Sequence, residues 1–207
     1  MHMKIKNTLL YISIIITMFY IGRHSISIIS QPVHTIEAIN YTIDAQYVDE
    51  MIDFTAEATY IKKTFKSSMS LSKIKHLLIY IDGLCQHYDL NYNLVKSVIS
   101  TESNWHPRAK SSAGALGLMQ IMRACATDYK TPHSEMYDPY VNVTIGIKYL
   151  SKLTKRFNNT LTALVGYNEG PRYAKNYKID YINNSRYVHK VMNYLSDFDS
   201  TTEVAGI

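Results

Sequence analysis

Residues 100–120 of the chain read STESNWHPRAKSSAGALGLMQ, and Glu102 is the only acidic residue among them. No Asp or Glu occurs between Ser103 and Thr127. Sites that work with two carboxylates normally hold the second within reach of the acid. The pattern here favours a reaction in which one carboxyl acts first as an acid and then as a base, while the substrate supplies its own nucleophile.

The residues before Glu102 predict a helix from about 93 to 102. Val95, Val98, Ile99 and Glu102 are spaced at i, i+3, i+4 and i+7, so they share one helix face. Burial against apolar neighbours would raise the pKa of the carboxyl, which a general acid near neutral pH requires. The alternative is that Glu102 is the first solvated residue after the helix ends.

Helical spacing dominates the chain after residue 70. An apolar stripe from Leu71 to Tyr88 predicts a helix of five turns that Ser70 or Ser72 can cap. Asp138-Pro139 predicts the start of another helix, with Asp as the N-cap and Pro as the first helical residue. Further helices are expected near 161–167, where the sequence at 168–171 is a stop signal, and from about 185. No strand-like alternation reaches a convincing length, so the predicted fold class is all-α.

The length of 207 residues allows one domain of moderate size with a tail or an anchor. Residues 70–199 are expected to form the domain. The other expected parts are a signal peptide or signal anchor at 1–30, a linker and helix at 31–69, and a tail at 200–207.

The N-terminus predicts export. Lys4 and Lys6 precede an apolar run from Thr8 to Ile21, which Gly22-Arg23 ends. A charged start and a short apolar core are typical of a signal peptide, and the run can also serve as an uncleaved anchor in the inner membrane. Either form places the protein in the cell envelope, on the periplasmic side.

Charge and aromatic content point to an anionic, sugar-containing partner. Residues 70–199 hold sixteen Lys and Arg against ten Asp and Glu, which fits a polymer such as bacterial cell wall. No basic run is interleaved with aromatic residues, which argues against nucleic acid. Tyr (18) far outnumbers Phe (5) and Trp (1). These tyrosines either stack on sugars or fill amphipathic helices.

Cysteine and histidine usage gives no sign of a metal or another cofactor. The eight His are dispersed without the spacing of zinc ligands. Only Cys85 and Cys125 occur, and they either form a disulfide or remain two buried thiols.

Three motifs now resemble one family. The first is E-S-x-W-x-P-x-A-x-S-x-x-G-A-x-G-L-M-Q-I-M from Glu102 to Met122, the second D-P-x-x-N-V-x-x-G-x-x-Y-L from Asp138 to Leu150. The third is A-L-V-G-Y-N-E-G-P from Ala163 to Pro171. Together they are similar to the bacterial lytic transglycosylases with a soluble-transglycosylase, goose-lysozyme-like catalytic domain. The resemblance covers about residues 75–197 and implies a lysozyme-like all-α fold with a substrate groove.

The resemblance also implies an activity on peptidoglycan. Such enzymes cleave the β-1,4 bond between N-acetylmuramic acid (MurNAc) and N-acetylglucosamine (GlcNAc), and leave a 1,6-anhydro-MurNAc end because the sugar's own O6 attacks the anomeric carbon. Glu102 would be the acid and then the base. The alternatives are a hydrolytic lysozyme on the same fold and a catalytically idle peptidoglycan-binding protein. Envelope or secretion machinery is a possible further partner.

Individual residues take expected roles by their position in these motifs. Ser111 would orient the acetamido group and Glu102, unless it is only a turn residue. Tyr167 would hydrogen-bond near Glu102. The set expected to bind substrate is Ser111, Gln120, Met122, Tyr167 and Asn168. The set expected to be structural is Gly114, Gly117, Asn142 and Tyr187, where Gly117 would allow either close backbone approach or tight packing.

The sequence departs from the family pattern at three places. Arg123 replaces the usual proline after Met122, and Glu169 replaces the usual alanine of the third motif. Asn183-Asn184 stands where the family often has Glu-Thr, which removes a carboxylate expected near the site. Glu169 could stand in for that carboxylate, or could be a solvated loop acid.

Overall fold

The computed structural model of the chain describes residues 54–204. The predicted signal or anchor segment at 1–30, and the predicted linker as far as residue 53, lie outside the described residues. Within 54–204 the structure has no β-strand beyond two isolated antiparallel bridges, Lys110 with Leu116 and Leu116 with Ile121. The predicted all-α class is therefore confirmed for this part of the chain. In the same part, no helix combines the length and hydrophobicity that a membrane crossing requires.

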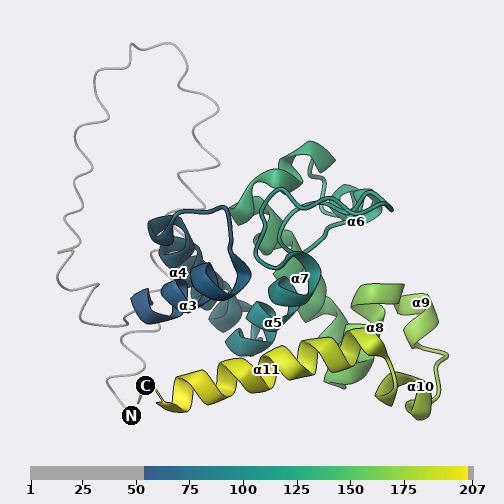
Figure 1. Cartoon of the computed structure of the whole chain (residues 1–207). Helices are drawn as coiled ribbons and strands as arrows, with labels where there is room; N and C mark the ends of the chain where they lie inside the picture. Colours follow the sequence, from purple (N-terminus) through teal and green to yellow (C-terminus); the bar gives the residue numbers. More distant parts are fainter. Residues whose placement is uncertain (1–53, 205–207) are drawn as a thin grey trace, which may run out of the picture. The chain divides into compact units, whose positions relative to one another are not determined.

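The helices follow one another along residues 55–204 (Figure 1). They are α3 (Thr55–Phe65), α4 (Leu71–Tyr88), α5 (Tyr92–Ser103), α6 (Arg123–Asp128), the 3-10 helix η1 (His133–Tyr137), α7 (Pro139–Phe157), α8 (Thr160–Glu169), α9 (Pro171–Ala174), α10 (Ile179–Asn183) and α11 (Arg186–Val204).

Local capping explains where the main helices begin. The Ser70 side chain accepts a hydrogen bond from Lys73 N at the start of α4, and Asp138 accepts from Tyr140 N and Val141 N at the start of α7. Asn91 caps α5 in the same way through Leu94 N. Helix α8 ends at Glu169, where Gly170 takes a positive φ of 97°. The caps at Ser70 and Asp138 and the end of α8 agree with the sequence predictions, whereas the Asn91 cap was not predicted.

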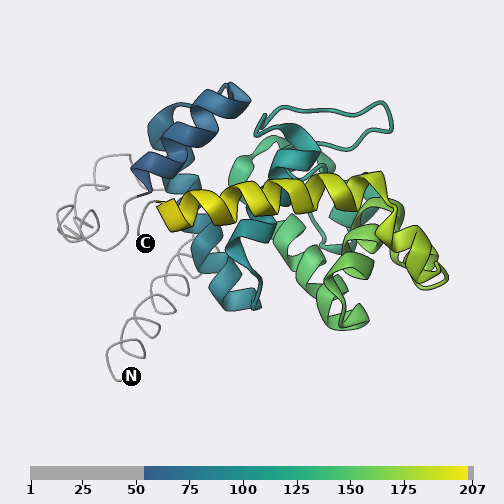
Figure 2. The ribbon, with the colours of Figure 1, turned by 60° about the horizontal axis from the view of Figure 1, so that its bottom comes forward.

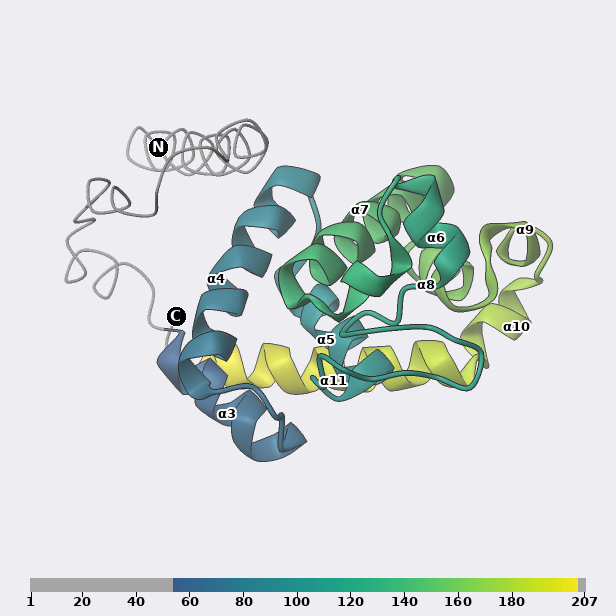
Figure 3. The ribbon, with the colours of Figure 1, turned by 90° about the horizontal axis from the view of Figure 1, so that it is seen from above.

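The core is built around α5, α7 and α11. Helix α4 packs on α3, α5 and α7, while α7 packs on α8. Helix α11 runs across α5 and α8, as Figures 2 and 3 show from two directions. Buried apolar side chains line these contacts, among them Leu77, Val98, Ile147 and Val191, which have no exposed surface.

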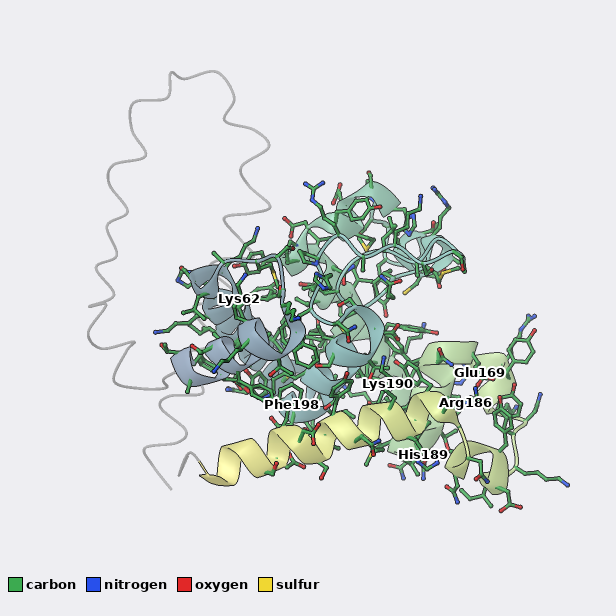
Figure 4. The ribbon with its side chains drawn as sticks, viewed as in Figure 1. Lys62, Glu169, Arg186, His189, Lys190 and Phe198 are labelled. Carbon is green, nitrogen blue, oxygen red and sulfur yellow. The ribbon has the colours of Figure 1, made fainter. Side chains whose placement is uncertain are left out.

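Helix α3 belongs to the same compact unit as the helices after residue 70. An ion pair between buried Lys96 and partly buried Glu57 joins α5 to α3, because Lys96 Nζ contacts Glu57 Oε1. Lys96 is 1% exposed, and its ammonium group also lies 4.2 Å from the Tyr92 ring centroid and 4.5 Å from that of Phe198 (labelled in Figure 4). Burial lowers the pKa of Lys96, and the nearby Glu57 carboxylate opposes this shift.

At the other end of the unit, α11 continues through Val204, so the first part of the expected tail 200–207 is helical. Cys85 and Cys125 are both free thiols in the structure, so they form no disulfide there; Cys85 is buried as expected, whereas Cys125 is only partly buried.

We predict that Glu57→Gln destabilises the protein by about 2–3 kcal/mol, because the buried Lys96 charge then loses its directly bonded counter-charge. Urea unfolding at neutral pH measures the change. Glu135→Gln, at an exposed position on η1, is the matched control and should change stability by less than about 0.5 kcal/mol. An equally small effect of Glu57→Gln would mean that the ion pair does not hold α3 in place.

Candidate active site

Glu102 lies in the last turn of α5, at the end of its apolar face. Val95, Val98 and Ile99 on this face are fully buried. The Glu102 side chain is itself partly buried. The structure therefore supports the first of the two sequence interpretations, a carboxyl held against apolar neighbours.

Helix α11 supplies the polar groups around Glu102. The Tyr187 hydroxyl donates a hydrogen bond of 2.7 Å to Glu102 Oε1. One turn further along α11, Lys190 Nζ donates a 3.0 Å hydrogen bond to the Thr101 carbonyl oxygen (Lys190 is labelled in Figure 4). Glu102 is thus held from the side by a helix that lies far away in the sequence.

Burial raises the pKa of Glu102 from its ordinary value of 4.5 to about 7. The Tyr187 hydrogen bond and the positive charge of Lys190 favour the carboxylate and oppose this rise, but desolvation is the larger effect. Within residues 54–204, no carboxylate is among the groups that shift the pKa of Glu102. A carboxyl with a pKa near 7 can both give and take a proton close to neutral pH.

The tyrosine that contacts Glu102 differs from the expected one. Tyr167, on α8, donates its hydroxyl to the Met119 carbonyl oxygen at 2.8 Å, and its ring packs on Tyr149 with centroids 5.4 Å apart. The negative charge of Glu102 raises the pKa of Tyr167 after the larger effect of burial, so the two groups act on each other without a hydrogen bond. Tyr187, expected to be structural, makes the direct contact.

The chain leaves α5 through a tight, anchored turn. Asn104 and Trp105 both take positive φ angles, 48° and 60°. The Trp105 ring is fully buried, and its Nε1 donates to Ser100 Oγ at 2.9 Å. The Ser67 hydroxyl donates to the Trp105 carbonyl oxygen at 2.7 Å. These bonds fix the direction in which the motif continues after Glu102.

The following loop folds back on itself. Ser111 accepts a hydrogen bond from Ala115 N at its Oγ, and its backbone N–H donates to the Ala115 carbonyl, both at 3.0 Å. Gln120 Nε2 donates to the carbonyl oxygens of Gly117 at 2.9 Å and Ala109 at 3.3 Å. Both residues therefore brace the loop, and their expected contacts with a sugar stay predictions.

Asn142, from α7, ties this loop to the core. Its Nδ2 donates to the carbonyl oxygens of Leu116 and Met136, each at 2.9 Å, and its Oδ1 accepts from Met119 N at 2.7 Å. Gly117 passes so close that a Cβ there would lie 2.1 Å from the Met136 carbonyl oxygen. Gly117 also has a φ of 77°, so the position requires glycine both for the close approach to Met136 and for its left-handed backbone.

The remaining expected site residues are more exposed. Met122 is 44% exposed and directly precedes α6, and Asn168 is exposed near the end of α8. Gly114 lies in the loop turn with a φ of 86° and open space where a Cβ would be. Within residues 54–204, neither Met122 nor Asn168 forms a hydrogen bond with Glu102.

Glu169 does not replace the missing carboxylate. Its side chain (labelled in Figure 4) accepts hydrogen bonds from the hydroxyls of Tyr177 at 2.8 Å and Tyr181 at 3.0 Å. These two rings stack with centroids 3.9 Å apart. Glu169 thus joins the end of α8 to α10 and is neither a free loop acid nor a partner of Glu102.

Comparisons with known proteins identify the family and the fold of the chain. The model of the Transglycosylase SLT domain family matches residues 79–188, just over half of the chain, and the chain belongs to this family. It is 37% identical over 93 residues to the "Soluble lytic murein transglycosylase" of Salmonella typhimurium, covering 40% of this chain and 14% of the relative. It is 38% identical over 94 residues to the "Transglycosylase" of Enterobacteria phage PRD1, covering 45% of this chain and 35% of the relative.

Two solved structures share the fold. An inactive mutant of the lytic transglycosylase Slt from Pseudomonas aeruginosa matches 60% of this chain and 24% of its own length, with a TM-score of 0.53 and 22% identity. The 70 kDa soluble lytic transglycosylase from Escherichia coli matches 72% of this chain and 29% of its own, with a TM-score of 0.52 and 19% identity. The chain thus spans about a quarter of the length of each structure, and 14% and 35% of the two curated relatives.

We predict that Glu102→Gln stabilises the folded protein at high pH and not at low pH. Below about pH 4 the Glu102 carboxyl is protonated in both the folded and the unfolded chain. As the pH rises from 4.5 to about 7, the unfolded chain loses this proton first, so the wild type loses stability over that window. The glutamine variant should be more stable than the wild type by on the order of 2 kcal/mol at pH 8.

Urea unfolding of both proteins at pH 4 and at pH 8 measures this difference. A difference that is the same at both values of pH would show that the folded state does not raise the pKa of Glu102.

Proposed function

We propose that the chain is an exported peptidoglycan lytic transglycosylase that cleaves the MurNAc-β-1,4-GlcNAc bond and forms 1,6-anhydro-MurNAc ends. The observation that carries this proposal is the Glu102 carboxyl with a pKa of about 7, held by Tyr187. Membership of the SLT family supports it, as do the relatives named as lytic murein transglycosylases.

Glu102 performs both proton transfers. Protonated Glu102 gives its proton to the glycosidic oxygen, and the bond from this oxygen to the anomeric carbon of MurNAc breaks. The MurNAc O6 hydroxyl then attacks that carbon, and the Glu102 carboxylate takes the O6 proton as the ring closes. The residue returns to its starting state without water entering the reaction, and no second carboxylate is needed.

The surrounding groups set the balance between these two steps. The Tyr187 hydroxyl stabilises the carboxylate that forms after the first transfer, and Lys190 adds a positive charge nearby. Ser111 accepts a hydrogen bond through its oxygen, so its own hydroxyl hydrogen can point to the substrate's acetamido group. Gln120, Met122, Tyr167 and Asn168 complete the proposed substrate-binding set.

The location follows from the N-terminal sequence. The apolar segment within residues 1–30 would carry the domain across the inner membrane and could hold it there, facing peptidoglycan from the periplasmic side. An envelope or secretion machine that needs a local opening in the wall is the proposed setting.

We predict that Glu102→Gln lowers the release of 1,6-anhydro muropeptides from purified sacculi by about 10²-fold to 10⁴-fold. Glutamine keeps the shape and can hydrogen-bond the glycosidic oxygen, but it cannot transfer a proton. Mass spectrometry of the soluble fragments measures the products, and urea unfolding checks that the variant is folded.

Release at the wild-type level by folded Glu102→Gln protein would disprove the proposed mechanism. Wild-type fragments that end in ordinary reducing sugars, with no anhydro ends, would instead identify a hydrolytic lysozyme on this fold.

We predict that Tyr187→Phe shifts the alkaline limb of the pH–kcat/KM profile to higher pH by about one unit. The Tyr187 hydroxyl favours the carboxylate, so its loss raises the pKa of Glu102 and keeps the acid protonated to higher pH. Tyr173→Phe, at a residue that is 63% exposed, is the control and should leave the profile unchanged. An unchanged limb in Tyr187→Phe would mean that the profile does not report Glu102.

A further inference from the structure

A second candidate site lies in a hollow of about 300 Å³ next to the end of α5. Its lining residues are Thr64, Phe65, Lys66, Asn104, His106 and Tyr194. Asn104 is two residues after Glu102, and Tyr194 lies on the same helix as Tyr187. Seven residues separate the two tyrosines, which places them on nearly the same face of α11, about 10 Å apart along its axis. The cavity therefore lies on the α11 face that also holds Glu102.

Most of the lining lies outside the range that the family model matches. Thr64, Phe65 and Lys66 at the end of α3, and Tyr194 on α11, all lie outside the matched residues 79–188. Only Asn104 and His106 lie within them. The family match therefore does not account for this cavity.

The chemistry of the lining suits a carboxylate. Lys66 brings a positive charge and His106 a ring N–H donor, while none of the lining residues is acidic. Within residues 54–204, neither the Lys66 ammonium group nor the His106 ring forms a hydrogen bond or ion pair, so both can bind a ligand. Phe65 and Tyr194 pack against each other with ring centroids 5.6 Å apart and provide an apolar wall.

The backbone around these groups is fixed in advance. The Ser67 hydroxyl donates to the Trp105 carbonyl oxygen at 2.7 Å, which ties the residue after Lys66 to the residue before His106. Lys62 Nζ donates to the carbonyl oxygens of Ser67 and Met69 and so holds the turn after α3. Binding a ligand therefore costs little entropy for ordering the backbone that carries Lys66 and His106.

We propose that this cavity binds a carboxylate of the peptide stem that peptidoglycan carries on its MurNAc residues. This inference rests on the proposed function, because it takes peptidoglycan as the substrate. Stem carboxylates are the anionic groups that such a substrate would bring closest to Glu102. The apolar wall suits the small aliphatic side chains of a stem, and the site would favour glycan that still carries its peptides.

The test compares two soluble muropeptides, a disaccharide tetrapeptide and the same molecule with its carboxylates converted to carboxamides. Binding is measured by titration calorimetry with full-length Glu102→Gln protein, which does not consume the ligand. The carboxylate form should bind about fivefold more tightly, as expected for one partly exposed ionic contact. Adding Lys66→Asn should remove this preference, and adding Lys66→Arg should keep it.

The substitutions are chosen to leave the fold intact. Lys66 has a φ of 50°, and asparagine adopts this left-handed region more easily than most residues. Lys63→Asn, at an exposed position on α3 outside the cavity, is the charge-matched control and should keep the preference.

Equal binding of the two muropeptides, or an equal loss of affinity for both in Lys66→Asn, would overturn the proposal. Binding is measured without turnover, so it does not depend on the reaction that the enzyme catalyses. A wild-type enzyme that forms no anhydro ends would refute the proposed function, whereas the binding comparison would still test this site.

Discussion

The partial burial of one carboxyl, at the point where α5 meets α11, is the constraint on which the site depends. Glu102 is kept away from water enough to raise its pKa to about 7, yet Tyr187 and Lys190 keep the charged form accessible. An exposed carboxyl would be ionised at neutral pH and could not act as an acid. A fully buried one without a donor would stay protonated and could not act as a base.

The fold can impose this constraint because α11 packs on α5 in the opposite direction and contacts it at both of its ends. At one end Tyr187 bonds Glu102, and Lys190 bonds the Thr101 carbonyl. At the other end Asn93 donates to Asp199 at 2.6 Å, close to the buried Lys96. Helix α3 then closes this end through Glu57, so residues outside the family-matched range help to hold the helix that carries Glu102.

Much of the fold could be predicted from local sequence, because helix periodicity and caps are local signals. The start of α7 at Asp138-Pro139 and the end of α8 before Gly170-Pro171 are examples. The short helices α9 and α10 carry too few turns for periodicity to show them. The role of Tyr187 was missed because its contact with Glu102 joins positions 85 residues apart. Its spacing with Val191 and Tyr194 marks a helix face, but only tertiary packing shows what that face touches.

The central claim is that Glu102 exchanges a proton near neutral pH in the free protein. Its most direct test is an NMR titration of the Glu102 carboxyl carbon in the folded wild type, assigned by comparison with Glu102→Gln. The account predicts a single titration with a midpoint near pH 7. A midpoint at the ordinary glutamate value of 4.5 would contradict it.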